Sequence, residues 1–377
     1  MSSTRWTGPL IRPRQNTMKA GQINPQNLKV EINDVPIPKP NENEILVKIH
    51  CASLCHSDIM IFEPNDEMQY PEKATTMGHE ATGQVIEMGS NVKGFKKGDN
   101  IGFLPATNVC FDCIPCKQVH NMWCEKSQPV MQGFGSDGYF AEYAVVDYRS
   151  SMVLPENLDP VAAAPLFCAG VTAFHAIDDL KLPAGSWVAI VGCGGLGALA
   201  VQYARAMKYR VIGLDIAATA REEAKSLGAE YVFDSAAADN YLERVIEITG
   251  GGVDAAVNFT ASKRAYSAMP AIIRPGRGIL MAVGIPAEPI ELNAYDIALG
   301  KFRVMGSNNG TGYNMRAAIE FSAKHNIYSR LEYFTLDELP LMVKKMQNHE
   351  ARGRMAVKFG NSTGSISGSR NRSTSRL

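Results

Sequence analysis

The sequence predicts an α/β protein in two parts, a β-rich part and a doubly wound parallel sheet. Three observations favour this class. The 377 residues are too many for one compact core. Short β-like runs between turn residues extend from about residue 18 to 175. Strand-like and helix-like segments then alternate over about residues 177–313, as expected for a parallel sheet covered by helices.

In the first part, EILVKIH (44–50) and VKGFKKGDNIGF (92–103) are examples of the short β-like runs. After LKLPAGS (180–186) the pattern changes from short β-like runs to alternating strand-like and helix-like segments. The apolar run WVAIV (187–191), rich in β-branched residues, leads directly into GCGGLG. A helix follows, because apolar residues recur on one face at Leu196, Leu199, Ala200, Tyr203 and Met207. RVIGLD (210–215) then predicts a second buried strand.

Further strands are expected at VDAAVNF (253–259), GILMAV (278–283) and FRVMG (302–306), with helices such as AREEAKSLGA (220–229) between them. MRAAIEFSAKHN (315–326) and LDELPLMVKKMQ (336–347) predict helices that return to the first part. The resulting domains are 1–176 with 314–360, and 177–313. Residues 361–377 have almost no hydrophobic content and predict a disordered tail.

Composition and charge favour a small-molecule partner. Lys plus Arg and Asp plus Glu both total 38, and no basic block indicates a nucleic-acid or membrane surface. The first sixteen residues contain no continuous apolar segment, so we expect no secretory signal. The most apolar run, WVAIVGCGGLGALAV, is too short to span a membrane. The expected location is therefore the cytoplasm, where clustered cysteines favour metal over disulfides.

The glycine-rich turn lies between a predicted strand and a predicted helix, the context in which G-x-G-x-x-G indicates a dinucleotide site. Glycine lets the backbone approach a pyrophosphate at the helix N-terminus. Asp215 ends the next strand, where its carboxylate can accept hydrogen bonds from the adenosine ribose and would repel a 2′-phosphate. Ile216 supplies no compensating cation, so NAD is favoured over NADP. The alternative is a tight turn whose glycines serve packing only. The turn residues are Gly192, Gly194, Gly195, Leu196 and Gly197.

Half of the eight cysteines stand in CFDCIPCKQVHNMWC (110–124) with the spacing C-x2-C-x2-C-x7-C. Four thiolates in one loop can close a tetrahedral shell around zinc and leave no position for substrate, so this metal would be structural. A disulfide pair or an iron–sulfur cluster is the alternative. The four cysteines are Cys110, Cys113, Cys116 and Cys124.

A second set of metal ligands is dispersed along the chain in CHSD (55–58), GHE (78–80) and FCAG (167–170). Cys55, His79 and Cys168 would form a three-ligand zinc site with a fourth position open for water or an alcohol oxygen, which suits catalysis. Taken singly, each residue is equally compatible with ordinary packing. Cys51, expected on a strand, and Cys193 receive no role.

The order of these motifs resembles the zinc-dependent alcohol dehydrogenases of the medium-chain dehydrogenase/reductase family. The resemblance covers about residues 25–359 and includes GHEATGQVIEMGSNVKGFKKGD, APLFCAGVTAFHA and VGCGGLG. GSNNGTGYNMRAAIEF and HEARGRMAVKF are similar to the yeast-type branch. The resemblance implies a GroES-like catalytic domain joined to a Rossmann domain, with NAD and two zinc ions per chain.

The resemblance also assigns roles to single residues. It implies that Cys55, His79 and Cys168 bind the catalytic zinc and that Glu80 can approach this metal. Ser57 would pass on the substrate proton, and Asp58 would orient His79. His56 and Arg354 would lie near the coenzyme pyrophosphate. The clustered cysteines match the structural zinc.

Two departures from the family pattern concern the final proton transfer and the substrate pocket. Many relatives have a proton-relay histidine five residues after the first catalytic cysteine, where this chain has Met60. In FLPATN (103–108), no aromatic residue stands between Phe103 and Cys110, where yeast enzymes narrow the pocket. We therefore expect a wider pocket that takes bulkier allylic or benzylic alcohols and aldehydes.

The sequence thus favours an NAD-dependent zinc alcohol dehydrogenase. The alternatives are a zinc-free quinone or enoyl reductase of the same superfamily, or a non-catalytic dinucleotide-binding protein. The short connection between Cys124 and GSDGYF resembles tetrameric relatives, so a homo-tetramer is expected, with a dimer as the alternative. The tripeptide Ser375-Arg376-Leu377 resembles the S-K-L peroxisomal address, which makes a peroxisomal location the alternative to the cytoplasm.

Overall fold

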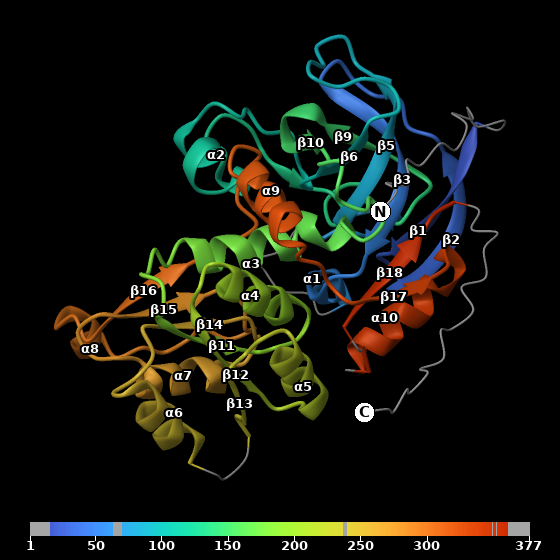
Figure 1. Ribbon diagram of the computed structural model, residues 1–377. Helices are drawn as coiled ribbons and strands as arrows, with labels where there is room; N and C mark the ends of the chain where they lie inside the picture. Colours follow the sequence, from blue (N-terminus) through green and yellow to red (C-terminus); the bar gives the residue numbers. More distant parts are fainter. Residues whose placement is uncertain (1–15, 63–69, 237–239, 349, 352, 361–377) are drawn as a thin grey trace, which may run out of the picture.

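The computed structural model describes residues 16–62, 70–236, 240–348, 350–351 and 353–360. The α/β class is confirmed, because a β-rich part lies beside a parallel sheet covered by helices (Figure 1). The predicted disordered tail at 361–377, which includes the S-R-L tripeptide, lies outside the described residues.

The β-rich part contains a seven-stranded sheet in the order β10-β6-β5-β3-β18-β17, with β9 also paired to β3. A three-stranded sheet, β2-β1-β4, and the short pair β7-β8 complete it. The strands are β1 Thr17–Asn24, β2 Lys29–Pro36, β3 Glu44–Ser53, β4 Thr75–Thr76, β5 Glu80–Met88, β6 Asn100–Phe103, β7 Ala106–Thr107, β8 Val130–Met131, β9 Tyr143–Asp147, β10 Ser151–Val153, β17 Leu331–Phe334 and β18 Arg354–Lys358.

The second part is a six-stranded, wholly parallel sheet in the order β13-β12-β11-β14-β15-β16. The strand order reverses between β11 and β14, and ligands of open α/β sheets bind at the carboxyl ends of the strands around such a point. The strands are β11 Trp187–Val191, β12 Arg210–Asp215, β13 Tyr231–Asp234, β14 Ala255–Asn258, β15 Gly278–Ala282 and β16 Phe302–Gly306.

Helices cover both faces of the parallel sheet. One core contains Val188 and Ile190 of β11 with residues of α3, α4 and α9, and a second contains Ala189 and Val191 with residues of α6 and α7. This alternation along one strand is what a sheet buried on both faces requires. The helices are α1 His56–Ile59, α2 Ile114–Gln118, α3 Ala169–Asp178, α4 Gly195–Ala206, α5 Ala218–Ser226, α6 Tyr241–Thr249, α7 Lys263–Ile272, α8 Ala294–Ala298, α9 Met315–His325 and α10 Leu339–Gln347.

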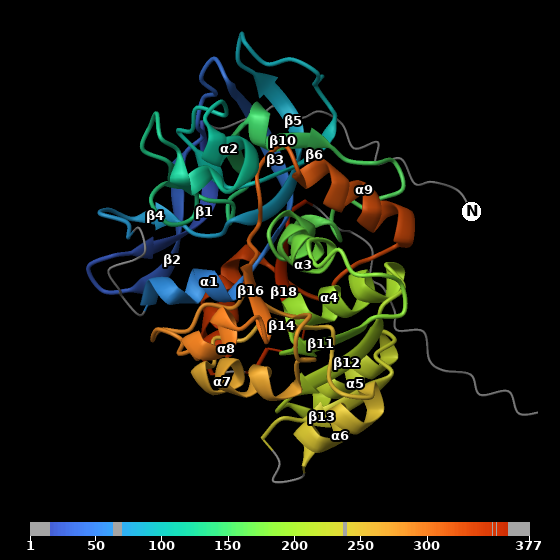
Figure 2. The same cartoon turned by 90° about the vertical axis from the view of Figure 1, so that its left-hand side faces the viewer.

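After the parallel sheet the chain returns to the β-rich part. Helix α9 packs against α3, and α10 contacts β2 and α1. Strand β18 then pairs with β3 on one side and β17 on the other, so the last described strand lies inside the first sheet. Figure 2 shows this orange-to-red segment running from the parallel sheet back into the β-rich part.

Two details differ from the sequence analysis. Strand β13 was not predicted, because Tyr231–Asp234 is short and Tyr231 is exposed at the sheet edge, which leaves little apolar periodicity. Within residues 92–103 only Asn100–Phe103 forms a strand, since Gly94 and Gly98 have positive φ angles that belong to turns. Cys51 lies on β3, as predicted.

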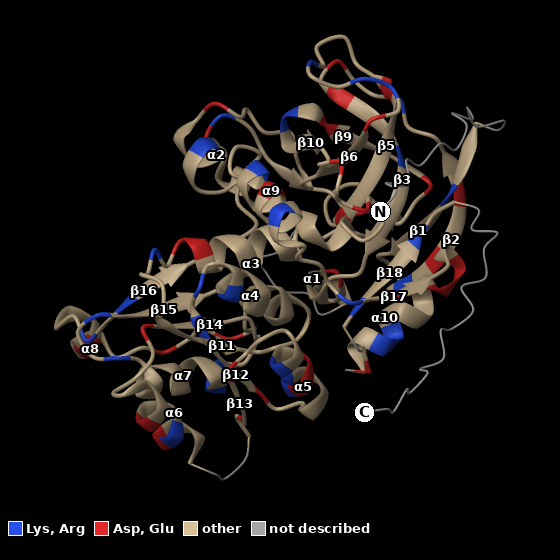
Figure 3. Cartoon of the chain, viewed as in Figure 1, with Lys and Arg blue, Asp and Glu red and all other residues tan. Residues whose placement is uncertain are grey.

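Two surface properties bear on partners. Among the described residues, no helix has both the length and the apolar character needed to cross a bilayer. Acidic and basic residues are scattered along the described chain, in keeping with the zero net charge of the sequence (Figure 3).

Candidate active site

Strand register brings the first two predicted metal ligands together. Strands β3 and β5 pair antiparallel with Ser53 opposite Glu80, so Cys55, just after β3, lies beside His79, just before β5. Strand β18 pairs with the other edge of β3, which places its first residue, Arg354, at the same end of the sheet. Cys55 follows β3, the first strand of this sheet along the chain, and Arg354 begins β18, the last one. Both therefore lie at the same end of the sheet.

Cys168 reaches this position from the segment that precedes α3. The 3-10 turn Ala164–Phe167 packs on β5 and β6, and Cys168 is the N-cap of α3. The ring of Phe167 occupies the space over Gly102, where a Cβ would overlap it. The glycine of β6 thus allows the close approach that brings Cys168 to the sheet end.

The three ligands and Glu80 form one cluster. Single ligand atoms of Cys55, His79, Glu80 and Cys168 all lie within 4.8 Å of one another. Three of these residues are buried, and Cys168 is partly exposed. Two thiolates and an imidazole are a donor set suited to zinc, and three such ligands leave a fourth position for an oxygen. The residues present therefore fit a catalytic zinc.

Asp58 connects two of the ligands. Its Oδ1 lies 2.7 Å from His79 Nδ1, and its Oδ2 accepts a hydrogen bond of 2.9 Å from the Cys55 backbone N–H. Burial by itself would lower the pKa of His79, but the Asp58 charge and hydrogen bond outweigh it and raise this pKa well above its ordinary value. Asp58 thus holds the ring so that Nε2 faces the thiols.

The two thiols do not titrate alike. The hydrogen bond to Cys168 and the contacts with His79 lower the pKa of Cys55, against the effect of its burial. The same hydrogen bond raises the pKa of Cys168, and burial raises it further. Because the two thiols are so close together, they titrate as one interacting pair.

Glu80 links the cluster to the dinucleotide domain. Both of its carboxylate oxygens contact Arg354 Nη2, and Oε2 also accepts a hydrogen bond of 2.6 Å from Ser53 Oγ. Burial raises the pKa of Glu80 to about 7, while the guanidinium opposes this shift. The Arg354 side chain also lies 3.0 Å from the position of a Cβ on Gly195, at the start of α4. Arg354 therefore lies between the metal ligands and the glycine turn.

The remaining catalytic candidates lie on α1. Ser57 is half-buried, with its hydroxyl 3.9 Å from the Cys55 sulfur, whereas His56 is exposed. Met60 is half-buried at the C-terminal end of α1. Ser57 is thus close enough to exchange a proton with a group bound at the ligand cluster.

The clustered cysteines form a second site away from the first. The sulfurs of Cys110 and Cys116 are 3.9 Å apart, close to the separation of about 3.8 Å that tetrahedral zinc with Zn–S bonds of about 2.3 Å requires. Backbone N–H groups donate to the sulfurs of Cys110 and Cys124. Burial resists ionisation of Cys124, but hydrogen bonds from Ser127 and nearby N–H groups lower its pKa to about 5. All eight cysteines are described and free, so the disulfide alternative is not supported.

The glycine turn has the shape that a pyrophosphate needs. Gly192 has a φ of +85°, which favours glycine, and a Cβ on Gly197 would overlap the Gly192 carbonyl oxygen. By contrast, a Cβ on Gly194 would have no heavy atom within 4 Å apart from those of the adjacent residues. Helix α4 starts at Gly195 with its N-terminal N–H groups at this turn, and such groups bind phosphate.

Asp215 lies at the carboxyl end of β12, beside this turn. Its Oδ2 accepts a hydrogen bond of 2.7 Å from Cys193 N–H, and its Oδ1 accepts one of 2.8 Å from Ala217 N–H. The carboxylate borders a hollow of about 190 Å³ that Ile216, Ser235 and Arg264 also line. This hollow is where the adenosine half of a dinucleotide would bind.

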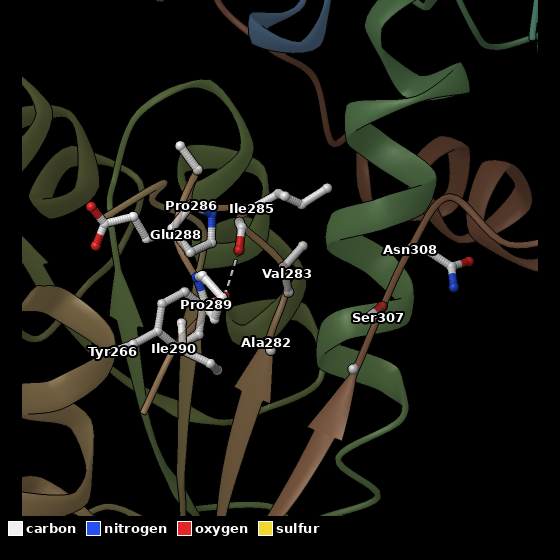
Figure 4. A pocket seen from close by; sticks show the side chains of 13 residues that line it. Tyr266, Ala282, Val283, Ile285, Pro286, Glu288, Pro289, Ile290, Ser307 and Asn308 are labelled. Carbon is white, nitrogen blue, oxygen red and sulfur yellow. Dashed lines mark hydrogen bonds between the residues drawn. The ribbon is translucent and has the colours of Figure 1, made fainter. Parts of the chain in front are cut away.

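A larger hollow, about 570 Å³, continues the same sheet edge at the carboxyl ends of β15 and β16. Figure 4 shows Ala282, Val283 and Ser307 on these neighbouring strand ends. The Tyr266 hydroxyl donates a hydrogen bond of 2.6 Å to the Gly284 carbonyl and holds the loop after β15.

Comparisons with known proteins agree with this geometry. Residues 41–156 match the family model of the alcohol dehydrogenase GroES-like domain, and residues 195–324 match that of the zinc-binding dehydrogenases. An alcohol dehydrogenase of Geobacillus stearothermophilus is 34% identical over 344 residues, which are 91% of this chain and 99% of that protein. The chain belongs to the zinc-binding alcohol dehydrogenases of the medium-chain family.

Solved structures support the same assignment of this zinc-binding alcohol dehydrogenase. The alcohol dehydrogenase of Aeropyrum pernix superimposes with a TM-score of 0.81 at 29% identity, covering 90% of this chain and 99% of that one. A zinc-binding dehydrogenase of Sinorhizobium meliloti, solved with NADP bound, gives a TM-score of 0.79 at 27% identity, covering 91% and 100%. The GroES-like and Rossmann folds expected from the sequence are therefore confirmed.

Sequence reasoning missed two residues beside the sites of this dehydrogenase. The ring of Phe134 lies 5.2 Å from the His79 ring, so an aromatic residue does approach the metal ligands, although none stands between Phe103 and Cys110. Arg221 contacts the backbone of Asp215 and Ile216, where the sequence showed no adjacent cation. Neither contact has a sequence pattern, because each depends on how separate segments pack.

Proposed function

We propose that this protein is an NAD-linked, zinc-dependent alcohol dehydrogenase acting on primary alcohols or the corresponding aldehydes. One observation carries this proposal. Cys55, His79 and Cys168 converge at one site. Contacts through Glu80 and Arg354 connect this site to the glycine turn. This arrangement supports the proposal, because hydride transfer requires the metal ligands and the dinucleotide site to lie next to each other.

The proposal includes two zinc ions per chain. When bound by Cys55, His79 and Cys168, zinc would act as a Lewis acid on an alcohol oxygen, and NAD would accept the hydride. A second zinc would be held by the four clustered cysteines and would stiffen the loop that contains α2. A zinc-free reductase would have no use for either buried ligand set.

Proton transfer would begin at Ser57, whose hydroxyl is near the ligand cluster. Because Met60 cannot accept a proton, the Ser57 proton would leave along the exposed side of α1, where His56 is a candidate acceptor. Asp58 keeps the His79 ring in place, and Glu80 keeps Arg354 beside the start of α4.

NAD is proposed over NADP because Asp215 would face the 2′ position of the adenosine ribose, where its charge repels a phosphate. Its two backbone hydrogen bonds hold the carboxylate in that place.

Bulky, allylic or benzylic substrates are proposed because the segment after β6 contributes only small or aliphatic side chains, Leu104 and Ala106 being buried there. Phe134, near His79, is the aromatic side chain that could limit the size of the site. Ethanol turned over faster than benzyl alcohol would contradict this part of the proposal.

We also propose self-association, with a homo-tetramer as the expected state. Exposed apolar side chains gather near β16, the last strand of the parallel sheet, where Tyr295 and Leu299 are 70% and 68% exposed and Val304 is 40% exposed. An edge strand with this character is suited to pair with another copy. Light scattering of the wild type and of Val304→Lys would test it, and a monomeric wild type would refute it.

The test of function is metal content measured beside NADH production with ethanol, allylic and benzylic alcohols. Two zinc ions per chain and NAD-linked turnover are expected. One zinc per chain with no turnover would refute the catalytic assignment, since the clustered cysteines would then hold the only metal.

A further inference from the structure

Arg221 is held behind the turn that borders the adenosine hollow. Its Nη1 donates to the carbonyl oxygens of Asp215 and Ile216, at 2.9 and 2.8 Å, and lies 3.1 Å from Asp234 Oδ2. Arg221 comes from the first turns of α5, and Asp234 ends β13. The guanidinium therefore bridges the carboxyl ends of the neighbouring strands β12 and β13.

The hollow and the guanidinium lie on different sides of this turn. Asp215, Ile216 and Ser235 line the hollow, whereas Arg221 lines a separate hollow together with Lys225. Asp234 is itself ordered, because its Oδ1 accepts a hydrogen bond of 2.9 Å from Ala236 N–H. Asp234 thus anchors Arg221 from a fixed position next to Ser235.

An arginine at this location bears directly on the choice between NAD and NADP. A cation near the end of the second strand accommodates the 2′-phosphate of NADP, whereas a carboxylate there accepts the ribose hydroxyl of NAD. In this chain the carboxylate faces the hollow and the cation is already paired with another carboxylate. A phosphate would gain little from a guanidinium whose charge Asp234 balances.

We propose that Asp234 is a specificity-determining positioning residue for the coenzyme. It pairs with Arg221 and keeps this cation away from the ribose 2′ position, so that Asp215 faces this position without an opposing charge from Arg221. The inference rests on the proposed function, since it concerns the NAD site. It predicts that Arg221 becomes a 2′-phosphate ligand once both carboxylates are removed.

Other charges around the hollow need to be separated from this effect. Arg264 lines the hollow from α7 and is exposed. Lys225 is held by a hydrogen bond of 2.6 Å from its Nζ to the Glu230 carbonyl. The contribution of Arg264 to NADPH binding therefore has to be measured with a variant of its own.

The test measures the dissociation constants of NADH and NADPH by nucleotide fluorescence with the full chain, without turnover. The variants are Asp215→Ser, Asp215→Ser with Asp234→Asn, and this pair with either Arg221→Ala or Arg264→Ala. An asparagine in place of Asp234 can still accept the hydrogen bond from Ala236 N–H, so the loop should fold. Asp234→Asn should tighten NADPH binding about tenfold in the Asp215→Ser background, and Arg221→Ala should remove this gain.

Glu230→Gln is the matched control. Glu230 pairs with Arg210 at 2.8 Å, so this ion pair also joins the segments of β12 and β13, but at the end of the strands remote from the hollow. In the Asp215→Ser background this change should leave the ratio of the two dissociation constants within about twofold.

No gain from Asp234→Asn, or an equal gain from Glu230→Gln, would overturn the inference. A gain that survives Arg221→Ala but disappears with Arg264→Ala would also overturn it. Binding is measured separately from catalysis, so the two proposals can fail independently. If the dissociation constants are as expected but the protein oxidises no alcohol, only the proposed function is contradicted. Alcohol oxidation with unchanged affinities would contradict only this inference.

Discussion

Replacing Asp58 by Asn should loosen the catalytic metal site without changing its shape. Asp58 is fully buried and accepts two hydrogen bonds, one from His79 Nδ1 and one from the Cys55 backbone N–H. An asparagine has one acceptor oxygen and one amide N–H₂ group. In either orientation of the amide, one of the two donors therefore meets another donor.

The size of the effect follows from that loss. One buried hydrogen bond to a charged group is worth about 1.5–3 kcal/mol. At about 1.4 kcal/mol for each factor of ten, zinc affinity should fall about 10- to 150-fold. This range overlaps the roughly 10- to 100-fold losses typical of groups that orient a metal-bound histidine.

The assay is competition for zinc with a chelator of known affinity, read together with kcat/KM for a good alcohol. Asp254→Asn is the matched control, because Asp254 accepts a hydrogen bond of 2.9 Å from Trp187 N–H in the parallel sheet, remote from the ligands. This control should lose stability but keep its zinc. An Asp58→Asn protein that keeps wild-type zinc affinity and kcat/KM would refute the assigned role of Asp58.

Three further predictions concern other parts of the chain. Cys116→Ser should lower the zinc content by one ion per chain while NADH still binds, as metal analysis and fluorescence would show, because the two ligand clusters are separate. Gly197→Ala should lower the melting temperature, since its Cβ would overlap the Gly192 carbonyl, whereas Gly194→Ala should keep the melting temperature and weaken only coenzyme binding. Burial lowers the pKa of His50 below its ordinary 6.5, so the folded state resists protonation. The contribution of His50 to the unfolding free energy should therefore be constant above about pH 6.5 and fall as the pH drops below it, so this fall should be smaller in His50→Gln.

Some features could be predicted from the sequence because short-range geometry controls them. The turn at residues 192–197 needs glycine for a positive φ and a close backbone approach, and both requirements show in the glycine spacing. Cys110 to Cys124 can surround a metal because few residues separate them. Strand β11 follows from five consecutive buried apolar residues.

The dispersed catalytic cluster could be predicted only through family resemblance. Spacing alone left Cys55, His79 and Cys168 equally compatible with ordinary packing, because no local rule relates residues so far apart. The register of β3 with β5 and the packing of Phe167 on Gly102 decide that the three meet.

Other contacts are properties of the tertiary structure alone. Phe134 lies beside His79, Arg354 lies between Glu80 and Gly195, and Asp234 pairs with Arg221. Each of these contacts joins separate segments, so its geometry depends on sheet order and side-chain packing, which periodicity and motif spacing do not encode. The sequence by itself thus determined the chemistry available to this dehydrogenase, and the tertiary structure decided which groups act together, because long-range contacts follow from the packing of the whole chain.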